Sequence, residues 1–531
     1  MSGRRVPASG KSDGMSITIA IIADVHLPDV GGTAQEAALV WALDSLARQP
    51  PDLVVFAGDM TAAGTSGSAR RFRDIVDRYG RGFRHLITPG NSDRRKPSDW
   101  PDVQRCLASA GSANGPGWAV VLLDTSTGQT TEAGRRDVVR SLGSESGGNV
   151  VLVTHVPPEQ LPAADREWLG AVVKVHPIRL LIGAHHHRDA AGCLHATPVH
   201  LVRGLDPDKA VGGPPSVTVF EDGANGWERR DWVFPHGIPQ RWSETDRRGF
   251  VDLLGFSCMQ ETLLGLEEAR RRQIRVVELR ADDAGTRSGA AVAEALAAWR
   301  QAGGAHLSIH MPNLRWDRTQ HAVQGVEGWR RALDLALVSE ASALTIHVPG
   351  ASVREMRAGG AAREPFAAFL AESLRVVAEK GMTIGFENMH AAPGESLDEN
   401  RSFGFTPAEC LDWVQCMRER LPAAARVGVH LDIGHARNNG LLATDFPLGS
   451  WYALVGATVT GYHLHQVVND GTAVRNHRAF HGLHGPLISL SSFLWAWEAG
   501  QLRRAPMCLE IRAPETGWPA YEHLAAQILT R

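Results

Sequence analysis

The chain has 531 residues, more than one ordinary hydrophobic core can hold, so we expect two or more domains. A hydrophobic content of 43% and a charged content of 21% are typical of a soluble globular protein. The formal net charge is −3, so there is no general basic field to attract nucleic acid or an anionic membrane. No apolar run approaches the roughly 20 residues that a membrane-spanning helix needs, so no membrane partner is expected.

The N-terminal segment, residues 1–15, is polar and is expected to be disordered. The run "ITIAIIADVHL" that follows is only about one strand long and breaks into Asp and His, unlike a signal-peptide core. The six cysteines are scattered and include no C-x-x-C pair. This usage favours a reduced, cytoplasmic protein.

Short β-branched runs alternate with amphipathic stretches from Ile17 to about Val199. The runs are "ITIAIIAD", "DLVVFAGD", "FRHLITPGN", "WAVVLLDT", "NVVLVTH" and "IRLLIGAH". This alternation predicts a layered α/β domain whose strands are buried on both faces. A hairpin with a Gly- and Asn-containing turn follows at Ser216–Phe234, and the domain is expected to span 16–235.

A second series of strands begins at Phe250, after a polar, Pro- and Gly-bearing segment at 236–249 that we expect to be a linker. Its runs are "FVDLLGFSC", "IRVVELR", "AHLSIHMP", "ALTIHVPG", "MTIGFENMH", "RVGVHLDIGHA", "VTGYHLHQ" and "MCLEIRAP". Helical stretches such as "EPFAAFLAESLRVVAEKG" separate them. Eight strand–helix units over about 280 residues predict a (β/α)8 barrel spanning 250–531.

In the first half, nearly every strand ends in a residue of a metal-ligating type, and active sites of α/β folds gather at such strand ends. A single Asp or His beside a strand is more often a cap or loop residue. Here seven candidates lie at successive strand ends: Asp24, His26, Asp59, Asn91, His155, His185 and His187. Two divalent metals that share a bridging carboxylate need about that many ligands, and such a pair activates a water and neutralises a phosphoryl group.

The order D-x-H, G-D, G-N, H and H-x-H resembles the calcineurin-like metallophosphoesterases across the first half of the chain. The resemblance implies a four-layer β-sandwich with flanking helices and two metals such as Mn, Fe or Zn. On one metal it places Asp24, His26 and His187. On the other it places Asn91, His155 and His185, with Asp59 bridging and with His155 and Asn91 as catalytic residues.

Two positions depart from that family's pattern. Many members have G-N-H-[DE], whose His donates to the leaving group, whereas this chain has Ser92 there. Members with another residue at that place resemble phosphodiesterases more than broad monoesterases, and loss of the acid could equally lower activity. Ala184 replaces the Gly of G-H-x-H, which is a small change. If strand geometry continues into "HHH", His186 points away from His185 and His187 and is expected to be dispensable.

Carboxylates and imidazoles also follow the strands of the second half. The candidates are His310, His347, Glu387, Asp432, His435, His463, His481 and Glu510. Such ligands converging at a barrel mouth suit Zn or Mn. Three other histidines are expected to pack in the core or to support the ligands: His306, His430 and His465.

This half resembles the endonuclease-IV-like, xylose-isomerase-like TIM barrels from about Phe250 to Arg531, through "HVPG", "EN" and "LDIGHA". The resemblance implies a metal quartet, with both glutamates catalytic: Glu387, Asp432, His463 and Glu510. His310 and His347, together with Glu387, resemble the extra site of the nuclease branch. His435 and His481 resemble a third site, but Ala479 replaces its Asp, so one or two metals are expected. In "YHLHQ", the pattern places His463 ahead of His465 as the ligand.

Together these patterns predict a bifunctional metal-dependent enzyme. The N-terminal domain would hydrolyse a small phosphorylated metabolite, with a phosphodiester favoured. The barrel would act on a related substrate as a second hydrolase, which His310 and His347 favour, or as a sugar isomerase or epimerase, which Ala479 favours. One alternative is a nucleic-acid-processing phosphodiesterase or endonuclease, which the absence of a Lys/Arg-rich stripe disfavours. Another is a protein with one active centre, or a scaffold whose sites have decayed.

Overall fold

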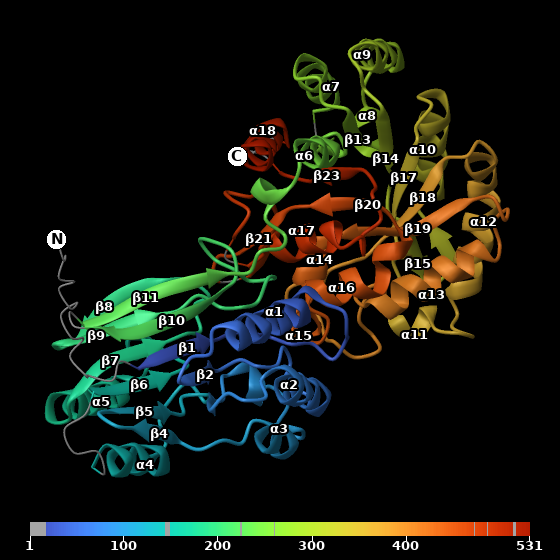
Figure 1. Ribbon diagram of the computed structural model, residues 1–531. Helices are drawn as coiled ribbons and strands as arrows, with labels where there is room; N and C mark the ends of the chain where they lie inside the picture. The colour runs from blue at the N-terminus through green and yellow to red at the C-terminus, as the bar shows by residue number, and fades with distance from the viewer. Residues whose placement is uncertain are drawn as a thin grey trace, which may run out of the picture. The chain divides into compact units, whose positions relative to one another are not determined.

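The computed structural model describes residues 17–143, 149–223, 226–259, 261–471, 473–485, 487–512 and 517–530. The expected disorder of residues 1–15 therefore falls outside the described residues. By compactness the chain divides into two units (Figure 1). The first comprises Met1–His26, Leu39–Leu205 and Ser216–Phe234, and the second comprises Leu27–Ala38, Asp206–Pro215 and Pro235–Arg531.

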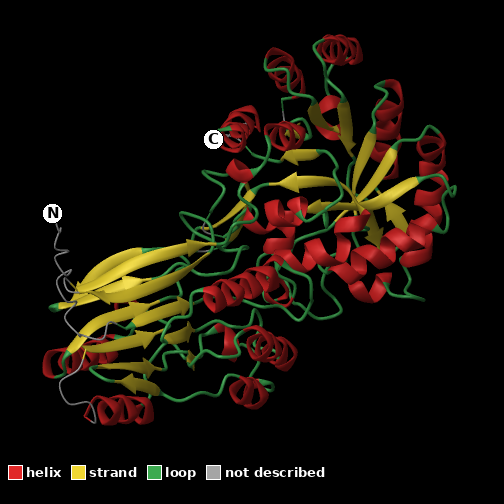
Figure 2. Ribbon diagram, viewed as in Figure 1, coloured by secondary structure: helices red, strands yellow, loops and turns green. Residues whose placement is uncertain are grey.

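The first unit is built on two mixed sheets (Figure 2). One sheet has the order β11–β10–β1–β2–β3, with β1 (Thr18–Ile22), β2 (Leu53–Ala57), β3 (His85–Thr88), β10 (Ser216–Gly223) and β11 (Gly226–Val233). The other has the order β4–β5–β6–β7–β9–β8, with β4 (Ser112–Gly115), β5 (Trp118–Leu123), β6 (Asn149–Thr154), β7 (Ile178–Gly183), β8 (Ala190–Leu194) and β9 (Thr197–Leu201). β1–β3 run parallel, as do β5–β7, so within each set the carboxyl ends share one edge.

Side chains from both sheets form one apolar core between them. Ile21 and Phe220 from the first sheet belong to the same buried cluster as Val153 and Ile182 from the second. Strands that are buried on both faces read as continuous β-branched runs, which is why the alternating runs could be recognised in the sequence. The predicted β-sandwich is therefore confirmed, as is the hairpin formed by β10 and β11.

Helices cover the outer faces of these sheets. They are α1 (Ala34–Arg48), α2 (Ser66–Tyr79), α3 (Trp100–Cys106), α4 (Glu132–Gly143) and α5 (Ala163–Val175), with the 3-10 turns η1 (Ser92–Arg94) and η2 (Pro158–Gln160). Phe72 of α2 packs edge-on against Phe56 of β2, with 5.2 Å between ring centroids. Leu142 of α4 and Leu169 of α5 pack against the other sheet through Leu152 of β6.

The second unit is a closed barrel of eight parallel strands. In barrel order they are β12 (Leu254–Cys258), β13 (Val276–Arg280), β14 (His306–His310), β17 (Ala343–His347), β18 (Thr383–Glu387), β19 (Arg426–Asp432), β20 (Val459–Leu464) and β23 (Met507–Leu509). Each coincides with one of the predicted runs, and the predicted (β/α)8 barrel is confirmed.

Helices follow the barrel strands on the outside. They are α7 (Thr262–Arg271), α8 (Ala281–Ala284), α9 (Gly289–Gln301), α10 (Val326–Val338), α11 (Val353–Met356), α12 (Arg363–Glu379), α13 (Pro407–Arg418), α14 (Ile433–Arg437), α15 (Leu442–Asp445), α16 (Leu448–Val455), α17 (Ser491–Glu498) and α18 (Gly517–Leu529), with the turn η4 (Gly456–Thr458). Two small hairpins were not expected from the sequence: β15 (Arg315–Asp317) with β16 (Ala322–Gln324), and β21 (Gln466–Asn469) with β22 (Val474–Arg478).

The interval 236–249, expected to be a linker, contains the turn η3 (Pro239–Arg241) and most of helix α6 (Glu244–Val251). The hydroxyl of Ser243 caps this helix by accepting the backbone N–H of Asp246 at 3.1 Å. Phe250, expected to begin a strand, lies in α6, and its ring meets that of Trp497 edge-on with 5.0 Å between centroids. The first barrel strand therefore begins later, at Leu254.

Among the described residues, none of the helices combines the length and apolarity that crossing a membrane requires. The largest apolar cluster of the second unit joins barrel strands to surrounding helices, and it includes Phe250, Trp329 and Trp413. Because this cluster surrounds the strands, it fixes the positions at which they end.

We predict that Phe250→Ala destabilises the barrel by about 3 to 5 kcal/mol, because it leaves a cavity beneath α6 where the buried ring was. Calorimetric unfolding should show a lower transition temperature for the barrel. Leu441→Ala is the matched control, since Leu441 is 70% exposed and its truncation should change the unfolding free energy by less than about 0.5 kcal/mol. Equal effects of the two changes would contradict the assigned packing of α6.

Candidate functional site

Parallel strands of the first unit deliver all seven predicted ligand residues to one place. Each lies just beyond a carboxyl strand end: Asp24 and His26 after β1, Asp59 after β2, Asn91 after β3, His155 after β6, and His185 and His187 after β7. Six of the seven form two groups, each with ligand atoms within 4.8 Å of one another: Asp24, His26 and His187 in one, and Asp59, His155 and His185 in the other.

Asp59 lies between the two groups. Its Oδ2 is 3.4 Å from Nε2 of His26, and its Oδ1 is 3.4 Å from Nε2 of His155. The backbone N–H of Ser92 donates to Oδ1 at 2.7 Å and so fixes the orientation of the carboxylate. Burial by itself raises the pKa of Asp59, but the imidazoles of His155 and His26 outweigh this and hold it well below its usual range. The carboxylate is ionised and turned to both sides, as a bridging ligand requires.

On one side, the imidazoles of His26 and His187 face each other. Their Nε2 atoms are 3.3 Å apart, and Nε2 of His187 is 3.7 Å from Oδ1 of Asp24. Oδ2 of Asp24 accepts the backbone N–H of His185 at 3.2 Å, which ties this group to the next. Two imidazole nitrogens at this separation need a proton or a cation between them, because two lone pairs repel.

On the other side, His155 is fixed by its backbone contact. Its Nδ1 donates to the carbonyl oxygen of Ala57 at 2.9 Å, so the neutral ring presents a lone pair at Nε2. That atom is 3.2 Å from Oδ1 of Asn91, a second acceptor, and 3.3 Å from Nδ1 of His185. Burial lowers the pKa of His155, but the Asp59 carboxylate outweighs it and raises the pKa to about 9. Below that pH, Nε2 of His155 carries a proton at the position where a metal ion would bind it.

The turns that carry these ligands are strained. Non-glycine residues rarely adopt positive φ, and each such position costs on the order of 1–3 kcal/mol. Five ligand residues do so: Asp24 (φ 50°), His26 (47°), Asp59 (58°), His185 (71°) and His187 (53°). Two neighbouring positions also exclude any side chain. A Cβ at Gly58 would lie 2.3 Å from Nδ1 of His155, and a Cβ at Gly90 would lie 2.2 Å from Oδ1 of Asp59.

Ser92, the departure noted in "GNSD", serves the structure of this turn. Its hydroxyl is fully buried and donates to the carbonyl oxygen of Thr61 at 2.7 Å. Asp93 beside it accepts the backbone N–H of Gly90 at 2.9 Å and that of Thr61 at 2.8 Å. Burial, aided by the charge of Asp59, raises the pKa of Asp93 to about 6. The Ser92 hydroxyl is therefore committed to the backbone and is not placed to protonate a leaving group.

His186 lies outside both groups, in contrast to the histidines on either side of it. Its Nε2 is 3.9 Å from Oε1 of Glu159, and its side chain is partly exposed. Strand geometry does not continue into "HHH", because β7 ends at Gly183 and both His185 and His187 adopt positive φ; His186 lies outside the two groups because of this turn.

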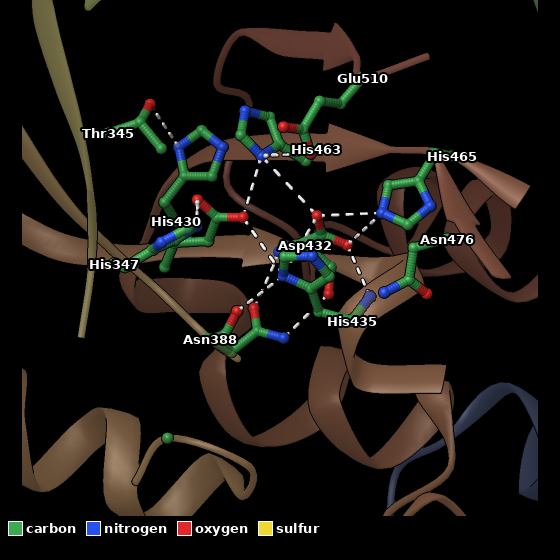
Figure 3. A network of polar contacts seen from close by, with 12 residues as sticks. Thr345, His347, Asn388, His430, Asp432, His435, His463, His465, Asn476 and Glu510 are labelled. Atoms are coloured by element: carbon green, nitrogen blue, oxygen red, sulfur yellow. Dashed lines mark hydrogen bonds and ion pairs between the residues drawn. The ribbon is translucent and has the colours of Figure 1, made fainter. Parts of the chain in front are cut away.

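In the second unit, the four residues of the predicted quartet converge at the carboxyl ends of β18, β19, β20 and β23. Figure 3 shows three of them, Asp432, His463 and Glu510. Nδ1 of His463 lies 3.1 Å from Oε1 of Glu387, 3.7 Å from Oδ2 of Asp432 and 3.5 Å from Oε2 of Glu510. All four side chains are buried. Burial lowers the pKa of His463, but the carboxylates of Glu278 and Glu387 outweigh it and hold the pKa well above its usual value.

Glu387 also contacts a second pair of imidazoles. Its Oε2 is 3.2 Å from Nε2 of His310 and 3.3 Å from Nε2 of His347. Nδ1 of His310 donates to the carbonyl oxygen of Met311 at 3.1 Å, and Nδ1 of His347 is hydrogen-bonded to Oδ1 of Asn313. Both rings therefore present Nε2 to Glu387. This carboxylate faces two sets of ligands, as Asp59 does in the first unit.

A further group in the barrel differs from the prediction. It consists of His435, His465, His477 and Glu510. Nε2 of His465 is 3.0 Å from Oδ1 of Asp432, and Nδ1 of His477 is 3.0 Å from Oε2 of Glu510. His481 was predicted for this place, but it is exposed, because the hairpin ends at Arg478 and presents His477 instead. Both histidines of "YHLHQ" contribute, His463 to the quartet and His465 to this group.

Three residues near the ligands were not singled out from the sequence. His477 lies on the unexpected hairpin, which gave no periodic signal. The ring of His390 lies 4.7 Å from that of His435, centroid to centroid, and His390 is separated from the "EN" motif by Met389. Glu278 is the lone carboxylate inside the apolar run "IRVVELR", and its Oε1 is 2.9 Å from Nε2 of His463. A carboxylate inside a buried strand is the signal that could have identified Glu278.

The donor sets of both units fit divalent metal ions. They combine imidazole nitrogens with carboxylate oxygens, which are ligands of Zn, Mn and Fe. Buried carboxylates and imidazoles crowded this closely need a shared proton or cation, and metal ligation supplies one. In each unit, one carboxylate, Asp59 or Glu387, faces two of these ligand sets.

The comparisons with known families agree with this geometry. Residues 17–189 match the family model described as calcineurin-like phosphoesterase, and residues 266–527 match the one described as xylose isomerase-like TIM barrel. The chain joins a calcineurin-like phosphoesterase domain to a xylose isomerase-like TIM barrel. All seven ligand residues of the first unit lie within the first match. No curated protein matches the chain.

Solved structures resemble each half. A D-tagatose 3-epimerase-like protein is 19% identical over 52% of this chain and 97% of its own, with a TM-score of 0.38. A dimetal phosphatase from Danio rerio is 14% identical over 41% of this chain and 99% of its own, with a TM-score of 0.31. A purple acid phosphatase from yellow lupin is 12% identical over 43% of this chain and 54% of its own, with a TM-score of 0.35.

We predict that the phosphoesterase domain binds Mn²⁺ more tightly as the pH rises, by about tenfold per pH unit until the pH approaches the His155 pKa of about 9. The affinity rises with pH because the Asp59 carboxylate stabilises a proton on His155. This proton must dissociate before a metal ion can bind Nε2. Calorimetric titrations in buffers of different ionisation enthalpy would count the released proton. An affinity that does not change between about pH 6 and about pH 8 would contradict the prediction.

We also predict that His477→Ala lowers the metal content of the barrel, whereas His481→Ala leaves it unchanged. His477 lies beside Glu510 within a ligand group, and His481 is exposed. Metal analysis of the two purified variants, with Glu387→Ala as a third, would test this. Loss of metal in His481→Ala alone would show that the hairpin takes another register when metal is bound.

Proposed function

We propose that the chain is a bifunctional metal-dependent enzyme. Its phosphoesterase domain hydrolyses a small phosphorylated metabolite, with a phosphodiester preferred, and its barrel acts on a related substrate. Two ions of Mn, Fe or Zn serve the first centre, and Zn or Mn serves the barrel. The observation that carries the proposal is the placement of Asp59, which turns one oxygen to His26 and the other to His155 at equal distances of 3.4 Å.

In the phosphoesterase centre the chain's residues act by holding ligands and charge in place. When bound, two divalent ions supply an activated water and neutralise the charge of the phosphoryl group. The Ser92 N–H fixes Asp59, and the Ala57 carbonyl fixes His155. The Arg95 guanidinium donates to the carbonyl oxygen of Ala62 at 2.6 Å, and we propose that it offers a positive group to an incoming phosphate.

The preference for phosphodiesters rests on the turn at Ser92. Because the hydroxyl of Ser92 donates to the carbonyl oxygen of Thr61, it is not available as an acid for the leaving group. Esters whose leaving group departs without a proton are therefore the better substrates. We expect aryl phosphodiesters to be hydrolysed faster than alkyl phosphomonoesters.

For the barrel we propose metal-dependent hydrolysis. Isomerisation needs the quartet alone. This barrel also has His310 and His347, which lie beside Oε2 of Glu387, whereas His463 of the quartet lies beside Oε1. It also adds His435, His465 and His477 beside Asp432 and Glu510. The additional ligands suit a second ion, which stabilises the charge that develops during attack on a phosphate ester.

Sugar isomerisation or epimerisation is the second candidate for the barrel. Glu387 and Glu510 both lie close to Nδ1 of His463, at 3.1 and 3.5 Å. Two carboxylates so placed can take a proton from a carbon beside a carbonyl and return it to the neighbouring carbon. Incorporation of solvent deuterium into ketose substrates would identify this chemistry, and its absence alongside phosphate release would support hydrolysis.

Nucleic acid is the disfavoured substrate class. The formal net charge of −3 gives no general attraction to a polyanion. Abasic duplex and single-stranded oligonucleotides should therefore remain uncleaved under conditions in which small phosphodiesters are hydrolysed. Their efficient cleavage would replace the metabolite proposal with a nuclease.

We predict that Asp59→Ala lowers the hydrolysis of a chromogenic aryl phosphodiester by at least about a thousandfold, because it removes the ligand shared by both groups. The rate of nitrophenol release would be measured in Mn²⁺. His186→Ala is the matched control from the same cluster of strand ends, and it should retain activity because His186 lies outside both groups.

Glu387→Ala separates the two centres in the same assay. It should leave the rate on the aryl phosphodiester unchanged, since Glu387 belongs to the barrel quartet. Full activity in Asp59→Ala together with loss in Glu387→Ala would show that the barrel is the hydrolase and would overturn the proposal for the first domain.

A further inference from the structure

Beneath the barrel quartet lies a buried carboxylate that none of the predicted metal sites includes. Oε1 of Glu278 is 2.9 Å from Nε2 of His463, and both side chains have no exposed surface. His463 thus has a carboxylate on each ring nitrogen, with Glu387 3.1 Å from Nδ1. The two contacts have different surroundings: Nδ1 faces the three carboxylates of the quartet, whereas Nε2 faces Glu278.

The contact at Nε2 determines which nitrogen is available to a metal. An imidazole that ligates a metal through one nitrogen keeps a proton on the other, and a carboxylate that accepts this proton fixes the ring and makes the ligand more basic. With Nε2–H donated to Glu278, the lone pair of His463 points from Nδ1 toward Glu387, Asp432 and Glu510.

Glu278 is itself held in place by two hydroxyls. Thr345 Oγ1 donates to its Oε2 at 2.7 Å, and Ser308 Oγ donates to the same oxygen at 3.2 Å. Because the Thr345 proton is used in this way, the contact of 3.4 Å between Thr345 Oγ1 and His430 Nδ1 is a donation from the ring. The four side chains are linked in series, and their donated protons converge on the Glu278 carboxylate, from His430 through Thr345 on one side and from His463 on the other.

The chain ends at a small cavity in the barrel floor. The cavity has a volume of about 20 Å³, and its lining includes His430, Ser308 and Thr383. Nε2 of His430 is buried and has no hydrogen-bond partner among the described residues. Glycines on the adjacent strands make room for this ring, since a Cβ at Gly461 would lie 2.7 Å from Nδ1 of His430. A space of this volume accommodates one water, and the unpaired nitrogen calls for a donor.

We propose that Glu278 is a positioning residue for the barrel metal centre, which acts by holding His463 with Nδ1 toward the metal. We propose also that one water in the floor cavity donates to His430 Nε2 and completes the chain. The inference rests on the proposed metal-dependent function of the barrel. It assigns Glu278 and His430 a role that requires neither to touch metal or substrate.

Zinc affinity of the barrel tests the role of Glu278. Chelator competition with the full chain should show a Kd that is about 10 to 100 times higher in Glu278→Ala, the loss typical of removing a partner of a ligating histidine. Glu278→Gln keeps an acceptor for Nε2–H and should recover part of the loss. Ser308→Ala, which removes only the longer hydroxyl contact, is the matched control and should stay within about threefold of the wild type.

Histidine NMR supplies a readout that does not depend on activity. With ¹⁵N-histidine labelling, the wild type should show a slowly exchanging Nε2–H on His463, which Glu278→Gln keeps in part and Glu278→Ala loses. Zinc uptake by the wild type with an unchanged Kd in Glu278→Ala overturns this inference alone. A wild-type barrel that takes up no metal overturns the proposed barrel function and this inference together.

Two further outcomes are informative. Loss of one whole zinc ion in both Glu278 variants, with the remaining ion bound as in the wild type, would show that Glu278 is itself a ligand and would overturn the positioning role.

A high-resolution crystal structure should show a water within hydrogen-bonding distance of His430 Nε2. An empty cavity there would overturn the water site.

Discussion

Both candidate sites depend on one constraint. Imidazole nitrogens and carboxylate oxygens, all of which carry lone pairs, lie close together in an interior that water does not reach. In the phosphoesterase domain, Nε2 of His155 faces oxygens of Asp59 and Asn91, and in the barrel Nδ1 of His463 faces three carboxylates. Atoms of this kind repel one another in a dry interior unless a proton or a metal ion lies between them. Protons and metals therefore compete for the same positions, and this links the metal content of each centre to pH.

Two unrelated folds meet this constraint in the same way. Each places a buried carboxylate, Asp59 or Glu387, at or just beyond the carboxyl end of a parallel strand, with ligand residues facing both of its oxygens. Parallel strands bring their ends to one edge, so residues distant in sequence meet there without long loops. In the first domain the backbone orients the ligands, through Ser92 N–H and the Ala57 carbonyl. The barrel also uses backbone contacts, such as that of His310 with the Met311 carbonyl, and adds a buried side chain, Glu278.

Much of this could be predicted from the sequence, because buried parallel strands read as apolar runs and the ligands directly follow them. The seven residues of the first centre and the quartet of the barrel share that pattern. His477 does not follow an apolar run. Its position depends on the β21–β22 hairpin, whose short strands have no apolar periodicity. Phe250 was assigned to a strand because an apolar residue after a polar segment fits a strand start as well as the end of a short helix. Glu278 was missed because its partner is set by barrel closure, which no local pattern encodes.

The left-handed turns of the phosphoesterase domain affect what the substitution of a ligand residue costs the backbone. Asp24, His26 and Asp59 each adopt a backbone conformation that glycine would adopt at no steric cost. Replacing a ligand by glycine there relieves strain at the moment it removes the metal site. Backbone strain and metal ligation are thus opposed at these positions, so glycine is the substitution that removes a ligand at the least steric cost to the turn.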